Sequence, residues 1–506
     1  MTLRALLSLA SLLPCATLAS AQVDYRLSFQ PDVSVWKVEA RFPGRGEMSH
    51  HFWIPLWTPG AYHVAEYARF VDSLTASDQD GAPLKVERPE TSHFILRGAE
   101  KAKEVVVSYA ARSISTETFS NNIIDVESNR ITESYAYVNP VSLFGFVPER
   151  AQEPVTLALE LPEGWDAATV LEQDDDGRFL APSYYRFEDS PFLFSPNMIT
   201  VEFLVDEKPH RVSVHGKGMD DVQTLAAGCQ KIVAAGSRLM QGLPYEHYHF
   251  LFGFVDEASG SGLEHSYSTL ILVNSSTTVA EETDSLWNIT AHEFFHLWCA
   301  ERIHVQEIHA PDLTQPLETG TIWVNEGITE YFSRHLLLHA GFLDEGEFFA
   351  TFMRGAALKG LAGDRSWTGV SRAASDWSGM QDLMQFAMRM YMLGPPTILA
   401  LDLELRRASG GERGVLDLLR TLRWAYVEAD RGFGENEMPA ILNGVAQADM
   451  GEFYRRFIDG AEIPDLASYL GVIGYRIEGG QAVPIEGASE EQLAARRDFL
   501  SADGRP

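Results

Sequence analysis

The residues best suited to do chemistry lie in the stretch His292-Glu293-Phe294-Phe295-His296, which contains the pattern H-E-x-x-H. On an α-helix, His292 and His296 are one turn apart on the same face, because a helix has about 3.6 residues per turn. Two imidazoles in that arrangement can bind one Zn²⁺ ion, and Glu293 beside them is placed to take a proton from water. The spacing therefore predicts a hydrolytic zinc site.

A catalytic zinc site needs a third protein ligand and an open position for water. The stretch Trp323-Val324-Asn325-Glu326-Gly327-Ile328-Thr329-Glu330 follows the two histidines in the chain. Glu326 is the predicted third ligand, and Glu330 is its competitor because it lies one turn further on the same helix face. Glu318 is a weaker alternative. We expect one zinc ion per chain, held by His292, His296 and Glu326.

A core helix is needed to position the two histidines. No Gly or Pro falls between Leu286 and Ala300, and most residues of this stretch are apolar. Thr283 and Asp284 are of the residue types that cap helix N-termini. Buried His and Glu cost free energy unless they are paired or bound to a metal ion, so their presence on an apolar helix supports the zinc site.

Several motifs, taken in order along the chain, resemble the glycyl aminopeptidase family of zinc metallopeptidases, which are relatives of the thermolysin-like aminopeptidases. Besides the two stretches above, these motifs are Trp57-Thr58-Pro59-Gly60-Ala61-Tyr62, Asp189-Ser190-Pro191, Gly262-Leu263-Glu264-His265 and Tyr391-x-x-Gly394. Together they cover most of the chain between about residues 25 and 460. The resemblance implies a zinc-dependent aminopeptidase that prefers a small N-terminal residue such as Gly or Ala.

The resemblance also implies roles for residues outside the zinc motifs. Tyr391 would stabilise the oxyanion, although relatives often carry Lys where this chain has Leu393, and a core tyrosine is the alternative. Gly262, Glu264 and His265 would bind substrate. A strand edge can pair with an extended peptide, which leaves Glu264 to face the α-ammonium group. His265 either orients Glu264 or lies at the surface.

Other residues near these motifs are expected to have structural roles. Cys299, three residues after His296, is predicted to be a buried free thiol, and the related family generally carries Asn there. Trp53, Trp57 and Tyr62 are expected in the core of a sheet. His304 and His309 lack ligand spacing and are expected to face solvent.

The periodicity predicts an α+β protein with a β-rich N-terminal part and a mainly helical C-terminal part. Residues 22–208 alternate between apolar and polar and are interrupted by Gly and Pro, which predicts an N-terminal β-sandwich or saddle-like domain. Residues 209–345 are predicted to form a thermolysin-like catalytic core with the zinc helix, and residues 346–460 a helical subdomain. Residues 364–377 have no clear period and are expected to be a loop. The tail, 461–506, is too short for the PDZ domain with which relatives commonly end.

Composition restricts the partners. The formal net charge is −31, which argues against nucleic acid or an anionic membrane as a partner and leaves peptides as the expected substrates. The first 21 residues have the pattern of a signal peptide, with Arg4, an apolar run from Ala5 to Leu18, and the cleavage site Ala19-Ser20-Ala21. We therefore expect a periplasmic or secreted protein, cleaved after Ala21 and not inserted in the membrane.

Two alternative functions remain open at this point. In a zinc endopeptidase of the same fold, Glu264 would not bind an amine. A non-catalytic peptide-binding protein is disfavoured, because His, Glu and Tyr residues of the types needed for catalysis are all present.

Overall fold

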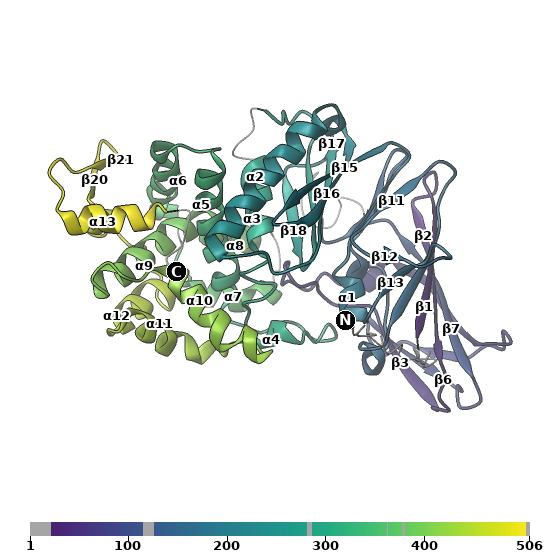
Figure 1. The fold of residues 1–506 in the computed structure, drawn as a ribbon. Coiled ribbons are helices and arrows are strands. Elements are labelled where there is room, and N and C mark those ends of the chain that lie inside the picture. The colour runs from purple at the N-terminus through teal and green to yellow at the C-terminus, as the bar shows by residue number, and fades with distance from the viewer. Residues whose placement is uncertain (1–21, 115–125, 281–285, 362, 377–379, 502–506) are drawn as a thin grey trace, which may run out of the picture.

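A computed structural model of the chain describes residues 22–114, 126–280, 286–361, 363–376 and 380–501. The predicted signal peptide and the predicted helix caps Thr283 and Asp284 lie outside the described residues. Figure 1 shows a β-rich N-terminal domain in purple and blue, a teal sheet with two helices, and a green helical part that ends in a yellow tail. The α+β fold class is confirmed.

The described residues of the N-terminal domain form three sheets. Their orders are β12-β13-β10-β1-β2-β7-β4, β11-β14-β9-β8 and β3-β6-β5. Alternation produces the main sheet, since Val23, Tyr25, Leu27 and Phe29 of β1 are buried while the residues between them are not. The strands are β1 (Val23–Gln30), β2 (Val35–Pro43), β3 (Ser49–Trp53), β4 (Val71–Asp78), β5 (Lys85–Glu87), β6 (His93–Arg97), β7 (Glu104–Arg112), β8 (Asn129–Ile131), β9 (Ala136–Val138), β10 (Val155–Glu160), β11 (Asp166–Ala168), β12 (Glu172–Gln173), β13 (Phe179–Ala181) and β14 (Phe192–Ser195), and the short helix α1 is Tyr184–Glu188.

The predicted domain boundary at residue 208 is wrong. Strand β15 (Met198–Val205) pairs antiparallel with β16 (Lys208–Gly216) and so belongs to the sheet of the second domain. The turn between them contains Asp206 and Glu207, which have φ of 51° and 63°. Two positive φ values define the tight turn that joins hairpin strands, but the usual Asn-Gly signal is absent here. The N-terminal domain therefore ends before Met198.

The second domain begins with a five-stranded sheet in the order β15-β16-β17-β19-β18, in which β18 is an edge strand. Its other strands are β17 (Tyr248–Val255), β18 (Ser261–His265) and β19 (Ser268–Asn274). The helices α2 (Val222–Met240) and α3 (Asn288–Phe295) pack on this sheet, and Phe250 of β17 lies 5.8 Å from Phe294 of α3, centroid to centroid. The helix with the two histidines is shorter than predicted, because the chain turns after His296 and Ala300 has φ of 140°.

The remainder of the chain is mainly helical, as predicted. Its helices are α4 (Gln306–His309), α5 (Thr329–Ala340), α6 (Glu345–Ala357), α7 (Trp367–Ala373), α8 (Met380–Ala387), α9 (Gly394–Ala408), α10 (Val415–Ala425), α11 (Met438–Ala446), α12 (Gly451–Phe453) and α13 (Glu490–Phe499). Among the described residues, no helix has the length and apolar character needed to cross a membrane.

One expectation for the helical part is corrected. Residues 364–377 were expected to be a loop, but Ser366 caps helix α7, whose Trp367 is fully buried. The described residues of the tail form the hairpin β20 (Tyr475–Glu478) and β21 (Gln481–Pro484) followed by α13. Phe499 of α13 lies 6.1 Å from Phe349 of α6, centroid to centroid.

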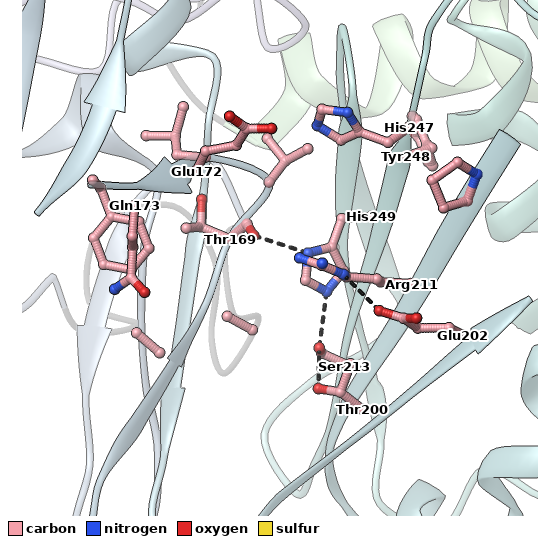
Figure 2. A pocket seen from close by; sticks show the side chains of 16 residues that line it. Thr169, Glu172, Gln173, Thr200, Glu202, Arg211, Ser213, His247, Tyr248 and His249 are labelled. Atoms are coloured by element: carbon pink, nitrogen blue, oxygen red, sulfur yellow. Dashed lines mark hydrogen bonds and ion pairs between the residues drawn. The ribbon is translucent and has the colours of Figure 1, made fainter. Parts of the chain in front are cut away.

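A cavity of about 720 Å³ opens between the N-terminal domain and the five-stranded sheet (Figure 2). His249 bridges the two domains there, because its Nδ1 lies 2.9 Å from the carbonyl oxygen of Thr169 and its Nε2 lies 2.8 Å from Oγ of Ser213. Burial lowers the pKa of His249 to about 4, so the imidazole is neutral at this contact. The residues that line this cavity do not include any of the predicted site residues.

Candidate metal centre

The three predicted zinc ligands meet in the folded chain. Nε2 of His292 and Nε2 of His296 are 3.0 Å apart. Oε2 of Glu326 lies 3.4 Å from Nε2 of His292 and 3.8 Å from Nε2 of His296. The histidines come from α3, and Glu326 comes from the π-helical turn Val324–Ile328 that precedes α5. All three side chains are buried and offer ligand atoms within 4.8 Å of one another.

The hydrogen bonds behind the two rings show that this group suits a cation. Nδ1 of His292 lies 2.6 Å from Oε2 of Glu330, and Nδ1 of His296 lies 3.0 Å from the carbonyl oxygen of Cys299. Because carboxylates and carbonyls only accept, each Nδ1 carries the proton, and both Nε2 lone pairs point toward Glu326. Two imidazole nitrogens and one carboxylate oxygen form a donor set that zinc prefers in catalytic sites.

The pKa values of the two histidines agree with this interpretation. Burial disfavours the charged form of His292, but Glu326 and Glu330 outweigh burial and raise its pKa well above the usual value. Burial lowers the pKa of His296 to about 4. The carboxylates around His292 thus stabilise positive charge at the point where the three ligand atoms converge.

The two competitors for the third ligand position, Glu330 and Glu318, lie away from the two Nε2 atoms. Glu330 sits behind His292, and its Oε1 lies 2.7 Å from Nη1 of Arg334. Burial opposes the charge of Glu330, yet Arg334 and His292 more than compensate and lower its pKa to about 2. Glu318 is exposed. Glu326 is therefore the carboxylate that the fold brings to the two Nε2 atoms.

Glu293 is buried beside the same group, against the backbone of edge strand β18. A Cβ atom added at Gly262 would lie 2.6 Å from Oε1 of Glu293, so the close approach requires glycine. Burial, together with the charges of Glu264 and Glu326, raises the pKa of Glu293 well above its usual value, although His292 opposes this. Gly262, predicted to bind substrate, thus also makes room for the predicted base.

Glu264 lies two residues further along β18 than Gly262 and on the same face of the strand. Its Oε1 is 3.9 Å from Nδ1 of His296, and Glu264, Glu293 and His296 offer ligand atoms within 4.8 Å of one another. Burial, and then the charge of Glu326, raises the pKa of Glu264 to about 7. A cationic partner would stabilise its ionised form.

His265 does not join the group. Side chains alternate along a strand, so His265 points to the other face of β18 than Glu264. Its Nδ1 lies 3.1 Å from Oδ1 of Asp189, which also accepts a hydrogen bond from the backbone nitrogen of Ser266 at 3.2 Å. That His265 binds substrate stays a prediction, while in this structure His265 faces Asp189. It anchors β18 to the Asp189-Ser190-Pro191 segment.

Tyr391 approaches the group from the helical part. It lies in the π-helical turn Met388–Met392, and its ring meets that of His292 edge-on at 5.6 Å, centroid to centroid. Burial, and then the charges of Glu326 and Glu293, raises the pKa of Tyr391 well above its usual value. The hydroxyl therefore remains a hydrogen-bond donor at neutral pH.

A cavity of about 370 Å³ begins at Tyr391 and Glu330. Asn288, which lies one turn before His292 on α3, also lines it. Its far wall comes from α6 and includes Thr351 and Arg354, and Arg354 is exposed.

Sequence reasoning missed one contact at this site. Tyr62 of the N-terminal domain donates a hydrogen bond from its hydroxyl to Oε1 of Glu326, with an oxygen–oxygen distance of 2.6 Å. Tyr62 was expected to be plain sheet core, as were Trp53 and Trp57. The only sign of this contact in the sequence was the place of Tyr62 in the motif Trp57-Thr58-Pro59-Gly60-Ala61-Tyr62. Hydrophobic periodicity reports local secondary structure and gives no information on a contact between two domains.

The remaining nearby residues have structural partners. Cys299 is a buried free thiol, as predicted, and its Sγ donates to the carbonyl oxygen of Val324 at 3.1 Å. Burial raises the pKa of this thiol to about 12. His304 and His309 are half-buried and lie against each other, with Nε2 and Nδ1 3.1 Å apart, so the expectation that they face solvent is wrong.

Comparison with known families and structures supports the same interpretation. Residues 24–196 match the peptidase M61 N-terminal domain, and residues 285–391 match the M61 glycyl aminopeptidase domain. None of the curated proteins compared with the chain matches it.

Solved structures share the fold. An aminopeptidase N family protein from Idiomarina loihiensis is 21% identical, with a TM-score of 0.78 over 90% of this chain and 79% of that chain. An M1 zinc metallopeptidase from Deinococcus radiodurans is 12% identical, with a TM-score of 0.55 over 88% of this chain and 95% of that chain. Yeast LTA4 hydrolase is 13% identical, with a TM-score of 0.55 over 90% of this chain and 70% of that chain.

Proposed function

The chain belongs to the M61 glycyl aminopeptidases, a family of metallopeptidases, and we propose that it removes a small N-terminal residue, Gly or Ala, from peptides. The assignment of zinc as the metal is supported by the donor set of His292, His296 and Glu326. The preference for a small residue comes from the family to which the chain belongs.

The observation that carries this proposal is the position of Glu264. Its carboxylate is buried, and it lies within 4.8 Å of ligand atoms of His296 and Glu293. In a peptide, the α-nitrogen is separated from its own carbonyl carbon by a single atom. A carboxylate this close to His296 and Glu293 would hold the α-ammonium group of a peptide whose first peptide bond is the one attacked. An ion pair there favours removal of one residue from a free N-terminus.

The other residues have roles that follow from their positions. When bound, a zinc ion supplies a Lewis acid for the carbonyl and lowers the pKa of water. Glu293 takes the proton from the attacking water and returns it to the departing amine. Burial raises the pKa of Glu293 well above its usual value, which makes this carboxyl a better proton acceptor than an exposed glutamate. The hydroxyl of Tyr391 donates a hydrogen bond to the oxyanion that develops on the carbonyl.

The cavity at Tyr391 can accommodate the peptide residues that follow the N-terminal residue. Glu264 lies near His296, whereas Tyr391 and Glu330 lie beside His292. Asn288 continues the same helix face beyond His292. A peptide with its ammonium group at Glu264 would therefore extend past His292 into this cavity, and the carboxylate of a short peptide would come near Arg354, which lines it.

Hydrolysis of Gly- and Ala-anilides tests the proposal. We expect cleavage by the purified protein, loss of cleavage after treatment with a zinc chelator, and recovery when zinc is added back. N-acetylated forms of the same substrates should be cleaved far more slowly. Equal cleavage of free and acetylated peptides would instead support an endopeptidase, and binding of peptides without cleavage would support a non-catalytic peptide-binding protein.

We also propose that the protein acts in the periplasm or outside the cell. The support is the signal-peptide pattern that ends at Ala19-Ser20-Ala21. N-terminal sequencing of the protein from its native host tests this, and we expect the mature chain to begin at Gln22. A chain that still begins at Met1 in the cytosolic fraction would contradict it.

A further inference from the structure

We propose that Tyr62 is a positioning residue of the metal centre, through which the N-terminal domain holds Glu326 in the orientation that binds the metal. The proposal rests on Glu326 being the third ligand, as in the function proposed above. It gives the N-terminal β domain a direct part in metal binding, in addition to any part in binding peptides.

The two oxygens of Glu326 have different neighbours. Oε1 accepts the hydrogen bond from the Tyr62 hydroxyl at 2.6 Å, while Oε2 faces the two Nε2 atoms of His292 and His296. The hydrogen bond therefore occupies one oxygen and leaves the other for the metal. A bond to an ionised acceptor is stronger than one between neutral groups, and both residues are at most 2% exposed. Such contacts behind a ligand orient it and tune its affinity for the metal.

The backbone of Tyr62 adopts a conformation that costs free energy. Its φ is 66°, in the left-handed region that a bulky aromatic residue rarely adopts. The turn is closed by hydrogen bonds from the backbone nitrogens of Ala61 and Tyr62 to the carbonyl oxygen of Thr58. The contacts of this turn therefore hold the side chain of Tyr62 in place against the strain of its backbone.

Gly60 brings the same loop against a second carboxylate. Its φ is +92°, and a Cβ atom there would lie 2.7 Å from Oε2 of Glu264. The loop 57–62 therefore touches both Glu326 and Glu264, one through a hydrogen bond and the other through close backbone contact. The group that binds the metal and the group proposed to bind the substrate are thus covered by one segment of the N-terminal domain.

The base of the loop is fixed to the second domain. Nε1 of Trp57 donates to the carbonyl oxygen of Gln315 at 2.8 Å. The backbone nitrogen of Leu56 donates to the carbonyl oxygen of Leu313 at 2.9 Å. Both acceptors lie in the segment between the zinc helix and Glu326. The loop is therefore tied to the chain that carries the ligand, and the hydroxyl of Tyr62 is held at a set distance from it.

The test compares Tyr62→Phe with Tyr25→Phe. Tyr25 is a matched control, because it is a buried tyrosine of the same domain whose hydroxyl donates to the carbonyl oxygen of Gly145 at 2.7 Å. Zinc affinity is measured on the metal-free proteins by competition with a chromogenic chelator, without any peptide. We expect Tyr62→Phe to bind zinc about 10–100-fold more weakly than the wild type, and Tyr25→Phe to bind it as the wild type does.

Two results would overturn the proposal. One is zinc affinity within about twofold of the wild type in folded Tyr62→Phe, and the other is an equal loss in Tyr25→Phe, which would indicate general destabilisation. If Tyr62→Phe does not fold, Trp57→Phe serves instead, since it keeps Tyr62 but removes one anchor of the loop. An intermediate loss of zinc affinity is expected there, and an unchanged affinity would reject the proposal.

This test separates the inference from the proposed function. A wild-type protein that binds zinc but cleaves no peptide would refute the aminopeptidase activity and leave the role of Tyr62 intact. Wild-type zinc affinity in Glu326→Ala would remove the ligand assignment, and the role of Tyr62 would fall with it.

Discussion

Oε2 of Glu330 lies 2.6 Å from Nδ1 of His292, on the side of the ring opposite to Nε2. This contact fixes the tautomer of His292 and directs its Nε2 lone pair toward Glu326. It also explains why two glutamates one turn apart have different tasks. Glu326 faces the metal position, and Glu330 holds a ligand from behind with the help of Arg334.

Replacing these two glutamates is expected to give different losses of metal. Glu326→Ala removes a ligand and should abolish stoichiometric zinc binding, measured by elemental analysis after dialysis. Glu330→Ala leaves all three ligands in place and should weaken zinc binding by about 10–100-fold. Full zinc content in Glu326→Ala together with complete loss in Glu330→Ala would reverse the assignment.

Glu293→Gln is expected to keep zinc and lose activity. The amide has the shape of the carboxyl, so it fits against Gly262, but it cannot accept the proton of the attacking water. We expect kcat for Gly- or Ala-anilides to fall by at least about 10²-fold while zinc content stays at one per chain. Near-normal turnover would remove Glu293 from the mechanism.

Glu264→Ala is expected to reduce cleavage of substrates with a free amine selectively. Truncating one partner of a desolvated charge pair costs about 2–5 kcal/mol, which corresponds to roughly 30-fold to several thousand-fold in kcat/KM. The measurement compares Gly- and Ala-anilides with their N-acetyl forms, at unchanged zinc content. If the substitution affects both substrate types alike, Glu264 does not bind the ammonium group.

Arg354→Ala is expected to weaken binding of short peptides that end in a free carboxylate. Arg354 is exposed, so the contact is worth at most about 1 kcal/mol, or roughly a fivefold rise in KM. The KM for C-terminally amidated forms of the same short peptides should be unchanged. Lys359→Ala, which removes another exposed cation beyond α6, is the matched control and should leave both substrates unchanged. An equal rise in KM for both substrates would exclude this cavity as a carboxylate site.

Stability is expected to fall as the pH is lowered from about 6.5 to 4. Burial lowers the pKa of His249 to about 4 in the folded protein, and the same holds for His210. An unfolded histidine takes up a proton near pH 6.5, so below that pH the unfolded state binds more protons and gains stability. Each such histidine contributes up to about 3 kcal/mol to the free energy of unfolding, and this contribution is fully present above about pH 6.5 and lost as the pH falls toward about 4.

Thermal unfolding at pH 7.5 and pH 5 measures this dependence. The decrease in Tm between the two values should be smaller in His249→Gln than in the wild type, because one of the responsible groups is gone. A Tm that rises on acidification, or an unchanged decrease in the variant, would contradict the assignment to His249.

Much of the fold follows from local patterns in the sequence. The alternation in β1, β2 and β10 and the apolar stretches of β7, α2 and β17 all correspond to elements of the structure. The strand β15 was assigned to the wrong domain, because its hairpin turn uses Asp206 and Glu207 rather than the residues that usually mark such turns. Helix α7 was missed because seven residues are too few to show a period.

The group that can bind zinc was predictable from the amino-acid sequence. His292 and His296 share a helix face through the geometry of a single turn, and no tertiary contact is needed to state it. Glu326 was predicted because a catalytic zinc site requires a third ligand, although the same motif also offers Glu330 as a competitor. These inferences depend on short spacings and on coordination chemistry, both of which are visible in a linear chain.

The contacts that support that group are visible in the folded structure and not in the sequence. The hydrogen bond from Tyr62 to Glu326 joins residues 264 positions apart, and the direction of His265 depends on which face of β18 turns toward the zinc helix. Contacts of this kind arise from the packing of one domain on another. Packing depends on the summed burial of many side chains, so no short spacing in the sequence records it.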